Sequence, residues 1–129
     1  MPRAKQLTAW VDDRPGVLGE VASALGAKKV NTIAFTAATV EGRGAIRLVV
    51  DKPAAAKKAL AERGWQTTEE DLVQITLSDK PGALGEAAKK LGAAGINIQY
   101  AYTGSAKSAA KVNTFCAVTD VAAALKALR

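Results

Sequence analysis

The chain has 129 residues, of which 49% are hydrophobic and 23% charged, and its formal net charge is +6. This composition is typical of a soluble globular protein and excludes disordered and fibrous classes. With no histidine and one cysteine, Cys116, the chain has no intramolecular disulfide, no histidine-dependent catalysis and no predicted metal or cofactor site.

The apolar segments and the basic charge further limit the function classes. No stretch of about 18 apolar residues occurs, so we expect a cytoplasmic protein without a membrane partner. The lysine pairs at 28–29, 57–58 and 89–90 fall on expected helices or at their ends, which is typical of solvated helix faces. A nucleic-acid partner is therefore not expected. Cys116 lies in an apolar run and is expected to be buried and inert.

The first half of the chain carries alternating strand and helix signals. Residues 6–11 alternate polar and apolar side chains, which predicts a strand, and Pro15 marks the start of a helix with one apolar stripe. Two strands joined by the compact turn 41–44, a helix and a last strand then follow. The predicted elements are a strand at 6–11, a helix after Pro15, strands at 30–39 and 44–50, a helix at 53–63 and a strand at 65–70.

The second half repeats the same order up to its last helix. Asp120 is a plausible N-cap for that helix, and no residues remain to form a final strand. In the second half Gly95 suits a left-handed helix cap, whereas Lys29 occupies this place in the first half, so we expect a strained or different first cap. The predicted elements are a strand at 72–77, a helix after Pro81, strands at 96–103 and 111–118 and a helix at 120–129.

A shift of 66 positions aligns Asp13–Asn31 with Asp79–Asn97 without a gap, and eleven of the nineteen residue pairs are identical. Such self-similarity indicates two copies of one supersecondary unit. The sequence therefore predicts an α+β protein with two modules, βαββαβ at residues 1–70 and βαββα at residues 71–129. In each module an antiparallel sheet has its helices on one face, and the missing last strand leaves a sheet edge in the second module open to pairing.

The repeated turns combine groups that suit a zwitterionic ligand. A helix that begins at Pro15 and Gly16 presents unpaired backbone amides to a carboxylate. Asp13 can bind an ammonium group, and Asn31 offers both a donor and an acceptor. The same residue types also suit any strand-to-helix turn, so the spacing leaves a purely structural role open.

The pattern D-x-P-G-x-L, a helix and a strand that opens with "VN" or "IN" resembles the ACT domain, a regulatory module of amino-acid metabolism. The resemblance covers almost the whole chain and is similar to small stand-alone tandem ACT proteins. It implies a ferredoxin-like fold for the modules and binding of a free amino acid where two modules meet. The ligand contacts of the family fall on Asp13, Arg14, Pro15, Gly16, Val17, Leu18 and Asn31 in the first copy and on Asp79, Lys80, Pro81, Gly82, Ala83, Leu84 and Asn97 in the second.

The leading hypothesis is a non-enzymatic amino-acid sensor that forms a homodimer and regulates an enzyme partner. A basic ferredoxin-like RNA-binding protein is the alternative, although residues 43–50 lack the aromatic residues of the RNA-binding strand signature. An acylphosphatase-like hydrolase with Arg14 and Asn31 in its site is a third possibility. The loop around Arg14 lacks a glycine-rich phosphate cradle, and Lys80 replaces Arg14 in the second copy.

Overall fold

The computed structural model of the protein describes residues 3–129. These residues divide into two compact units, and the division falls between Glu70 and Asp71. Arg3 and Ala4 belong to the second unit, although they lie at the start of the first strand. Each unit has its own hydrophobic core, as expected for a chain that repeats one supersecondary unit.

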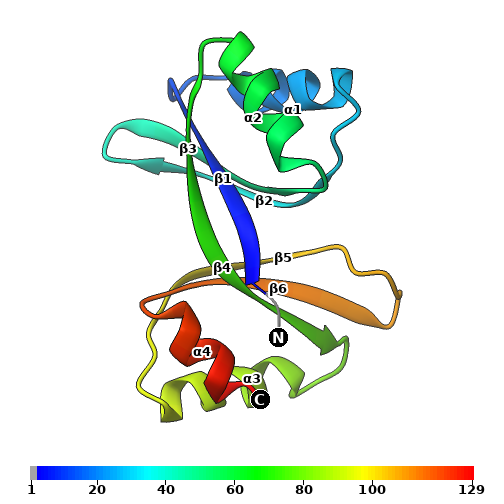
Figure 1. Ribbon diagram of the computed structural model, residues 1–129, viewed down its shortest axis with the longest axis vertical. Helices are drawn as coiled ribbons and strands as arrows, with labels where there is room; N and C mark the ends of the chain where they lie inside the picture. Colours follow the sequence, from blue (N-terminus) through cyan, green and yellow to red (C-terminus); the bar gives the residue numbers. More distant parts are fainter. Residues whose placement is uncertain (1–2) are drawn as a thin grey trace. The chain divides into compact units, whose positions relative to one another are not determined.

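The first unit has an antiparallel sheet in which β3 pairs with both β1 and β2. Figure 1 shows α1 and α2 beside each other on one face of this sheet. The core between the sheet and the helices includes Leu7, Leu25 and Leu60, each 0% exposed. The elements of this unit are β1 (Arg3–Val11), α1 (Val17–Ala27), β2 (Thr32–Val40), β3 (Arg43–Val50), α2 (Pro53–Glu62) and the beginning of β4 (Gln66–Ser78).

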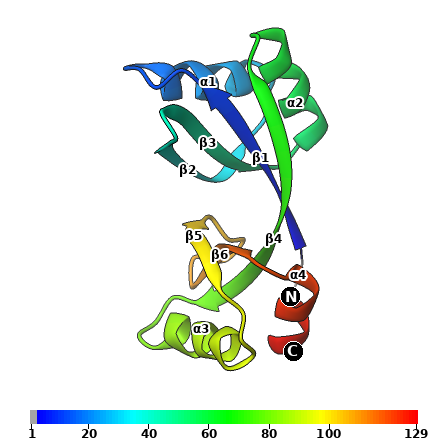
Figure 2. The same cartoon turned by 90° about the vertical axis from the view of Figure 1, so that its left-hand side faces the viewer.

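The second unit has the same arrangement. β6 pairs antiparallel with β4 and β5, and Figure 2 shows α3 and α4 on one side of this sheet. Cys116 lies in the core, as predicted, and burial raises the pKa of its thiol. Besides the end of β4, the elements are α3 (Ala83–Ala93), β5 (Ile98–Gly104), β6 (Lys111–Val118) and α4 (Val121–Ala127).

The strands predicted at 65–70 and 72–77 form one continuous strand, β4. The predicted break was wrong because the three acidic residues at 69–71, which interrupt the apolar pattern, each have a partner on β1. Lys5 Nζ lies 3.2 Å from Glu69 Oε2, Thr8 Oγ1 donates to Glu70 Oε1 at 2.6 Å, and Arg3 Nη1 lies 3.6 Å from Asp71 Oδ2.

Local signals at the starts of two helices and in the first hairpin are confirmed. Pro53 is the first residue of α2, and Asp120 Oδ1 accepts the N–H of Ala123 at 3.0 Å at the start of α4. The first hairpin turns through Glu41 and Gly42, which have φ of +51° and +80°, values that match a tight two-residue turn. Among residues 3–129, no strand follows α4.

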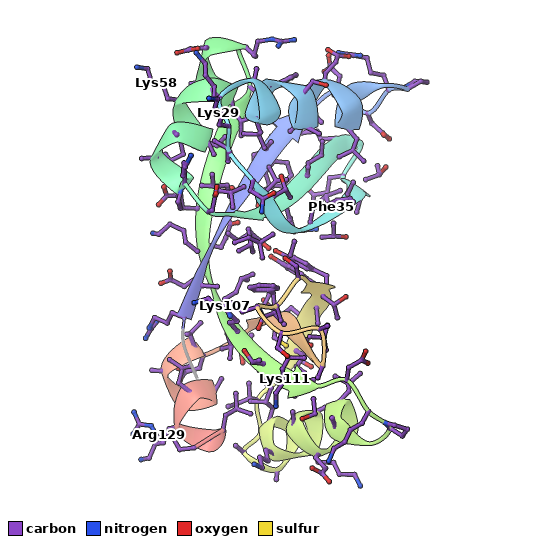
Figure 3. All side chains as sticks on the ribbon, turned by 90° about the vertical axis from the view of Figure 1, so that its right-hand side faces the viewer. Lys29, Phe35, Lys58, Lys107, Lys111 and Arg129 are labelled. Carbon is purple, nitrogen blue, oxygen red and sulfur yellow. The ribbon has the colours of Figure 1, made fainter. Side chains whose placement is uncertain are left out.

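The helices α1 and α3 end in the same way, so the expectation of a different shape for the first cap was wrong, whereas the expectation of a strained cap is confirmed by the positive φ of Lys29. Lys29, labelled in Figure 3, has φ of +58°, and the equivalent Gly95 has φ of +74°. The N–H of the next residue, Val30 or Ile96, donates to a carbonyl in the last helical turn at 3.1 or 2.9 Å. This bond satisfies a carbonyl at the helix end, and Lys29 adopts the left-handed conformation to make it.

Replacing Lys29 with glycine is expected to raise the free energy of unfolding by about 0.5–1 kcal/mol. Glycine removes the steric cost of the left-handed conformation, which exceeds the entropy that glycine adds to the unfolded chain. The reverse change, Gly95→Lys, should lower the free energy by a similar amount, and urea denaturation of both variants measures the two effects. A loss of stability in Lys29→Gly would contradict this account of the cap.

Candidate functional site

The two repeated turns have the same backbone geometry. Gly16 and Gly82 precede α1 and α3 and have φ of +88° and +89°, a left-handed conformation that glycine adopts at little cost. A Cβ atom at either position would meet no atom within 4 Å. Pro15 and Pro81 stand just before these glycines and are exposed. The approach to each helix start is therefore open.

Both helix starts leave backbone amides without a hydrogen bond. Among residues 3–129, no acceptor contacts the amides of Leu18 and Gly19 at the N-terminus of α1. The amides of Leu84 and Gly85 at the start of α3 are in the same state. Such amides carry the positive end of the helix dipole and favour a bound anion.

The aspartates of the two turns are both exposed but have different surroundings. Asp13 Oδ2 accepts a hydrogen bond from Thr39 Oγ1 of β2 at 2.9 Å, which ties the first turn to its neighbouring hairpin. Asp79 is held through its backbone, since its N–H donates to the carbonyl of Ala110 at 2.9 Å. Each carboxylate keeps oxygen lone pairs free for a cationic group.

Arg14 is committed to a partner inside its own turn. Its Nη1 lies 2.5 Å from Glu20 Oε2 and its Nη2 lies 3.0 Å from Glu20 Oε1. Two parallel hydrogen bonds of this kind are the strong, geometrically specific mode in which arginine binds a carboxylate. The hydrogen bond from Arg14 lowers the pKa of the Glu20 carboxyl. Lys80, the equivalent residue, forms no ion pair within residues 3–129.

We expect the carboxyl of Glu20 to titrate below the usual range of glutamates, and to return to that range in Arg14→Ala. Because its folded pKa is lowered, the pair stabilises the fold above the unfolded pKa, and this contribution is lost as pH falls through the folded pKa. The effect on stability is small because the pair is exposed. NMR titration of Glu20 in the natural chain and in Arg14→Ala measures the difference. Equal midpoints for Glu20 in the two proteins would contradict it.

Each turn is followed by two apolar residues, of which the second lies at the surface. Leu18 is 38% exposed and Leu84 is 62% exposed, whereas Val17 packs against the first core and Ala83 is half-buried. Leu18 and Val17 line a shallow groove of about 170 Å³ with Asp13 and residues 37–39 of β2. This groove lies beside the amide of Leu18 and offers apolar contact to a ligand.

The asparagines of the candidate site do not join the turns of their own units. Asn31 and Asn97 are exposed and stand just before β2 and β5, beyond the C-terminal ends of α1 and α3. The turns lie at the opposite ends of these helices, which have 11 residues each and are about 16 Å long at about 1.5 Å per residue. The backbone N–H of Asn31 donates to Asp51 Oδ1 at 2.9 Å, so this position also has a structural role.

A larger groove of about 450 Å³ also borders the first turn, and sequence reasoning missed most of its residues. The Arg43 guanidinium lies 5.0 Å from the ring centroid of Trp10, and that of Arg63 lies 5.5 Å from the ring centroid of Trp65. Arg14 lines the same groove. The signal in the sequence was that the two tryptophans of the chain both fall on predicted strands of the first copy, Trp10 in the strand at 6–11 and Trp65 at the start of the strand at 65–70.

The second unit has a groove of about 250 Å³ beside its own turn, lined partly by residues of α3. Lys80 and Lys111 line it with Glu86 and Lys90. Lys111 is the first residue of β6, as Arg43 is the first residue of β3. The two grooves are both basic, but the second contains no aromatic residue.

Two further searches of the described part of the chain concern metals and membranes. Within residues 3–129, no group of three or more Cys, Asp or Glu residues is placed to hold a metal ion. None of the helices in the same residues is both long and apolar enough to span a bilayer.

A family model described as an ACT domain pair matches residues 3–113. This chain belongs to the ACT domain family. The resemblance in the repeated D-x-P-G-x-L turns is thereby confirmed, and the two copies form a tandem pair of ACT modules with antiparallel sheets. No curated protein matches the chain.

Several solved structures share the fold of this tandem ACT chain. Protein BT0572 from Bacteroides thetaiotaomicron is 28% identical with a TM-score of 0.87, over 98% of this chain and 86% of that one. The ligand-free regulatory subunit of aspartate kinase from Thermus thermophilus is 19% identical with a TM-score of 0.68, over 99% and 95%. The regulatory subunit from Thermus flavus is 18% identical with a TM-score of 0.59, over 98% and 90%.

Proposed function

We propose that this ACT pair is a non-enzymatic regulatory protein that binds a free amino acid between its modules. The observation that carries the proposal is the repeated turn, in which two unpaired helix amides stand beside an exposed aspartate. The amides suit the carboxylate of an amino acid, and Asp13 or Asp79 suits its ammonium group. The shared fold with regulatory subunits of aspartate kinase supports a regulatory role.

The positions of the asparagines support a ligand site shared by two modules. Asn31 and Asn97 lie at the far ends of α1 and α3 from the turns of their own units. A free amino acid is much shorter than about 16 Å, the length of such a helix. A ligand that contacts both a turn and an asparagine must therefore take them from different modules, within one chain or in a homodimer.

Calorimetric titration of the whole chain with each of the twenty amino acids tests the proposal. At least one amino acid is expected to give saturable heat, and Asp13→Ala or Asp79→Ala should weaken its binding roughly tenfold or more, because each removes a charge-assisted contact. Asp12→Ala is the matched control, since Asp12 is also exposed but has no acidic equivalent at Ser78. Saturable heat from none of the twenty would overturn the proposal.

Domain organisation and assembly belong to the same proposal. We infer one module at residues 1–70 and a second module, without a last strand of its own, at residues 71–129. We also infer that the protein forms a homodimer in the cytoplasm. Its enzyme partner would have an activity that the bound amino acid controls. Ligand binding that favours one arrangement of the modules would provide this control. Sedimentation with and without the bound amino acid measures the assembly, and a monomer under both conditions would exclude the homodimer.

The two alternative functions gain no support from the site. A hydrolase that uses Arg14 and Asn31 together would need them close, but α1 separates them and Arg14 is bound to Glu20. For the RNA alternative, β3 carries no aromatic side chain on which a base could stack.

A further inference from the structure

The groove of about 450 Å³ in the first unit differs from the candidate amino-acid site in size and chemistry. It is formed by residues of the first unit only, and it contains both tryptophans of the chain. Trp10 and Trp65 are half-buried, and Trp10 Nε1 donates to Thr68 Oγ1 at 3.1 Å. These contacts fix the ring of Trp10. The volume is in the range of sites for cofactor-sized ligands and exceeds what one amino acid fills.

Two guanidinium groups of this groove lie against indole rings and form no ion pair within residues 3–129, although the charge of Arg63 also acts on the Glu20 carboxyl. Arg43 and Arg63 lie against the indole rings of Trp10 and Trp65. Within residues 3–129 neither forms an ion pair, whereas Arg14 is bound to Glu20. A planar guanidinium binds phosphate oxygens through two parallel hydrogen bonds, and its flat face stacks on planar rings.

The acidic rim of the groove argues against a simple inorganic anion. Asp12 and Asp13 also line it, and their carboxylates would repel an anion without hydrogen-bond donors. A ligand with hydroxyl or amino groups as well as a phosphate would satisfy both kinds of side chain. We propose that this groove binds a nucleoside phosphate, with its phosphate on Arg43 and Arg63 and its base stacked on a guanidinium–indole pair.

The groove beside the turn of the second unit provides a comparison within the chain. It has Lys80 and Lys111 in place of Arg14 and Arg43, and no aromatic ring lines it. An ammonium group attracts phosphate as a point charge but neither forks around it nor stacks on a base. The proposal is therefore restricted to the first unit.

Tryptophan fluorescence of the whole chain reports directly on this groove, because no tryptophan lies elsewhere. Titration with AMP, GMP, UMP and ATP is expected to change the fluorescence saturably, and calorimetry should give the same dissociation constant. Arg43→Ala and Arg63→Ala should each weaken binding roughly tenfold or more, since each removes charge-assisted hydrogen bonds. Adenosine and inorganic phosphate, each of which carries half of the ligand chemistry, should bind much more weakly.

Matched variants separate this site from general electrostatic attraction. Lys58→Ala, at an exposed position of α2 outside the groove (Figure 3), and Lys111→Ala, in the groove of the second unit, remove the same charge and should leave nucleotide affinity unchanged. Equal losses in these variants, equal affinity for inorganic phosphate, or binding of single-stranded RNA without binding of mononucleotides would each overturn the proposal. Arg63 does not belong to the proposed amino-acid site, so Arg63→Ala should bind amino acids as the natural chain does. Titration of this variant with amino acids therefore distinguishes a failure of the nucleotide proposal from a failure of the amino-acid proposal.

Discussion

Leu25→Ala is expected to lower the free energy of unfolding by about 2–5 kcal/mol, the largest effect of any substitution considered for this protein. Leu25 is 0% exposed and packs in the first core with Leu7 and Leu60. The change removes apolar contacts and leaves a cavity that the alanine-rich surroundings cannot fill without strain. Urea denaturation followed by circular dichroism measures the loss.

Leu18→Ala is the matched control, because Leu18 lies on the same helix but is 38% exposed. It should cost less than about 1 kcal/mol, since little of its side chain is withdrawn from water. In the second unit, Leu91 is the repeat equivalent of Leu25 and is also 0% exposed, so Leu91→Ala should resemble Leu25→Ala. Similar costs for Leu18→Ala and Leu25→Ala would contradict this description of the core.

Gly44→Ala is expected to lower the free energy of unfolding by about 1–3 kcal/mol. Gly44 of β3 stands opposite Val11 of β1, and a Cβ atom at position 44 would lie 2.8 Å from Val11 Cγ2 and 3.3 Å from the Val11 carbonyl oxygen. Val11 is buried, and its branched side chain has few rotamers in which to avoid the new methyl group. Thermal denaturation of the variant tests the clash.

A double mutant identifies the atom responsible. Val11→Ala removes the Cγ2 methyl group, so Val11→Ala combined with Gly44→Ala should cost less than the sum of the two single changes. Gly26→Ala is the control for adding a methyl group where nothing lies within 4 Å. Gly26 lies inside α1, and this change should stabilise the fold by about 0.5–1 kcal/mol through helix propensity. Strict additivity in the double mutant would show that the clash lies elsewhere.

Most of the fold could be predicted from local signals, because backbone sterics act over a few residues. Pro53 and Asp120 mark the starts of α2 and α4 in both the sequence and the structure. For the cap at Lys29 the local signals left a strained and a different backbone open, and they could not decide between the two. The side chain of Lys29 disfavours φ of +58°, but the hydrogen bond that closes α1 requires that backbone conformation.

The candidate site could be predicted only in part. The turns at Gly16 and Gly82 follow from the repeat, since both copies place a glycine before the helix and glycine adopts the left-handed conformation at little cost. That Asn31 stands about one helix length away from its own turn follows from the chain order, once the length of α1 is considered. The pairing of Arg43 with Trp10 joins residues 33 positions apart, and no local pattern indicates it.

The repeat, the α+β class, the starts of the helices and the ACT family were all readable in the order of the residues, because each rests on short-range geometry or on self-similarity. The continuity of β4, the partners of its acidic residues on β1 and the arginine–tryptophan groove required the folded chain. All three depend on how strands that are distant in sequence pair with one another. A shift of one residue in that pairing would turn the acidic side chains of β4 and the side chain of Trp10 to the opposite face.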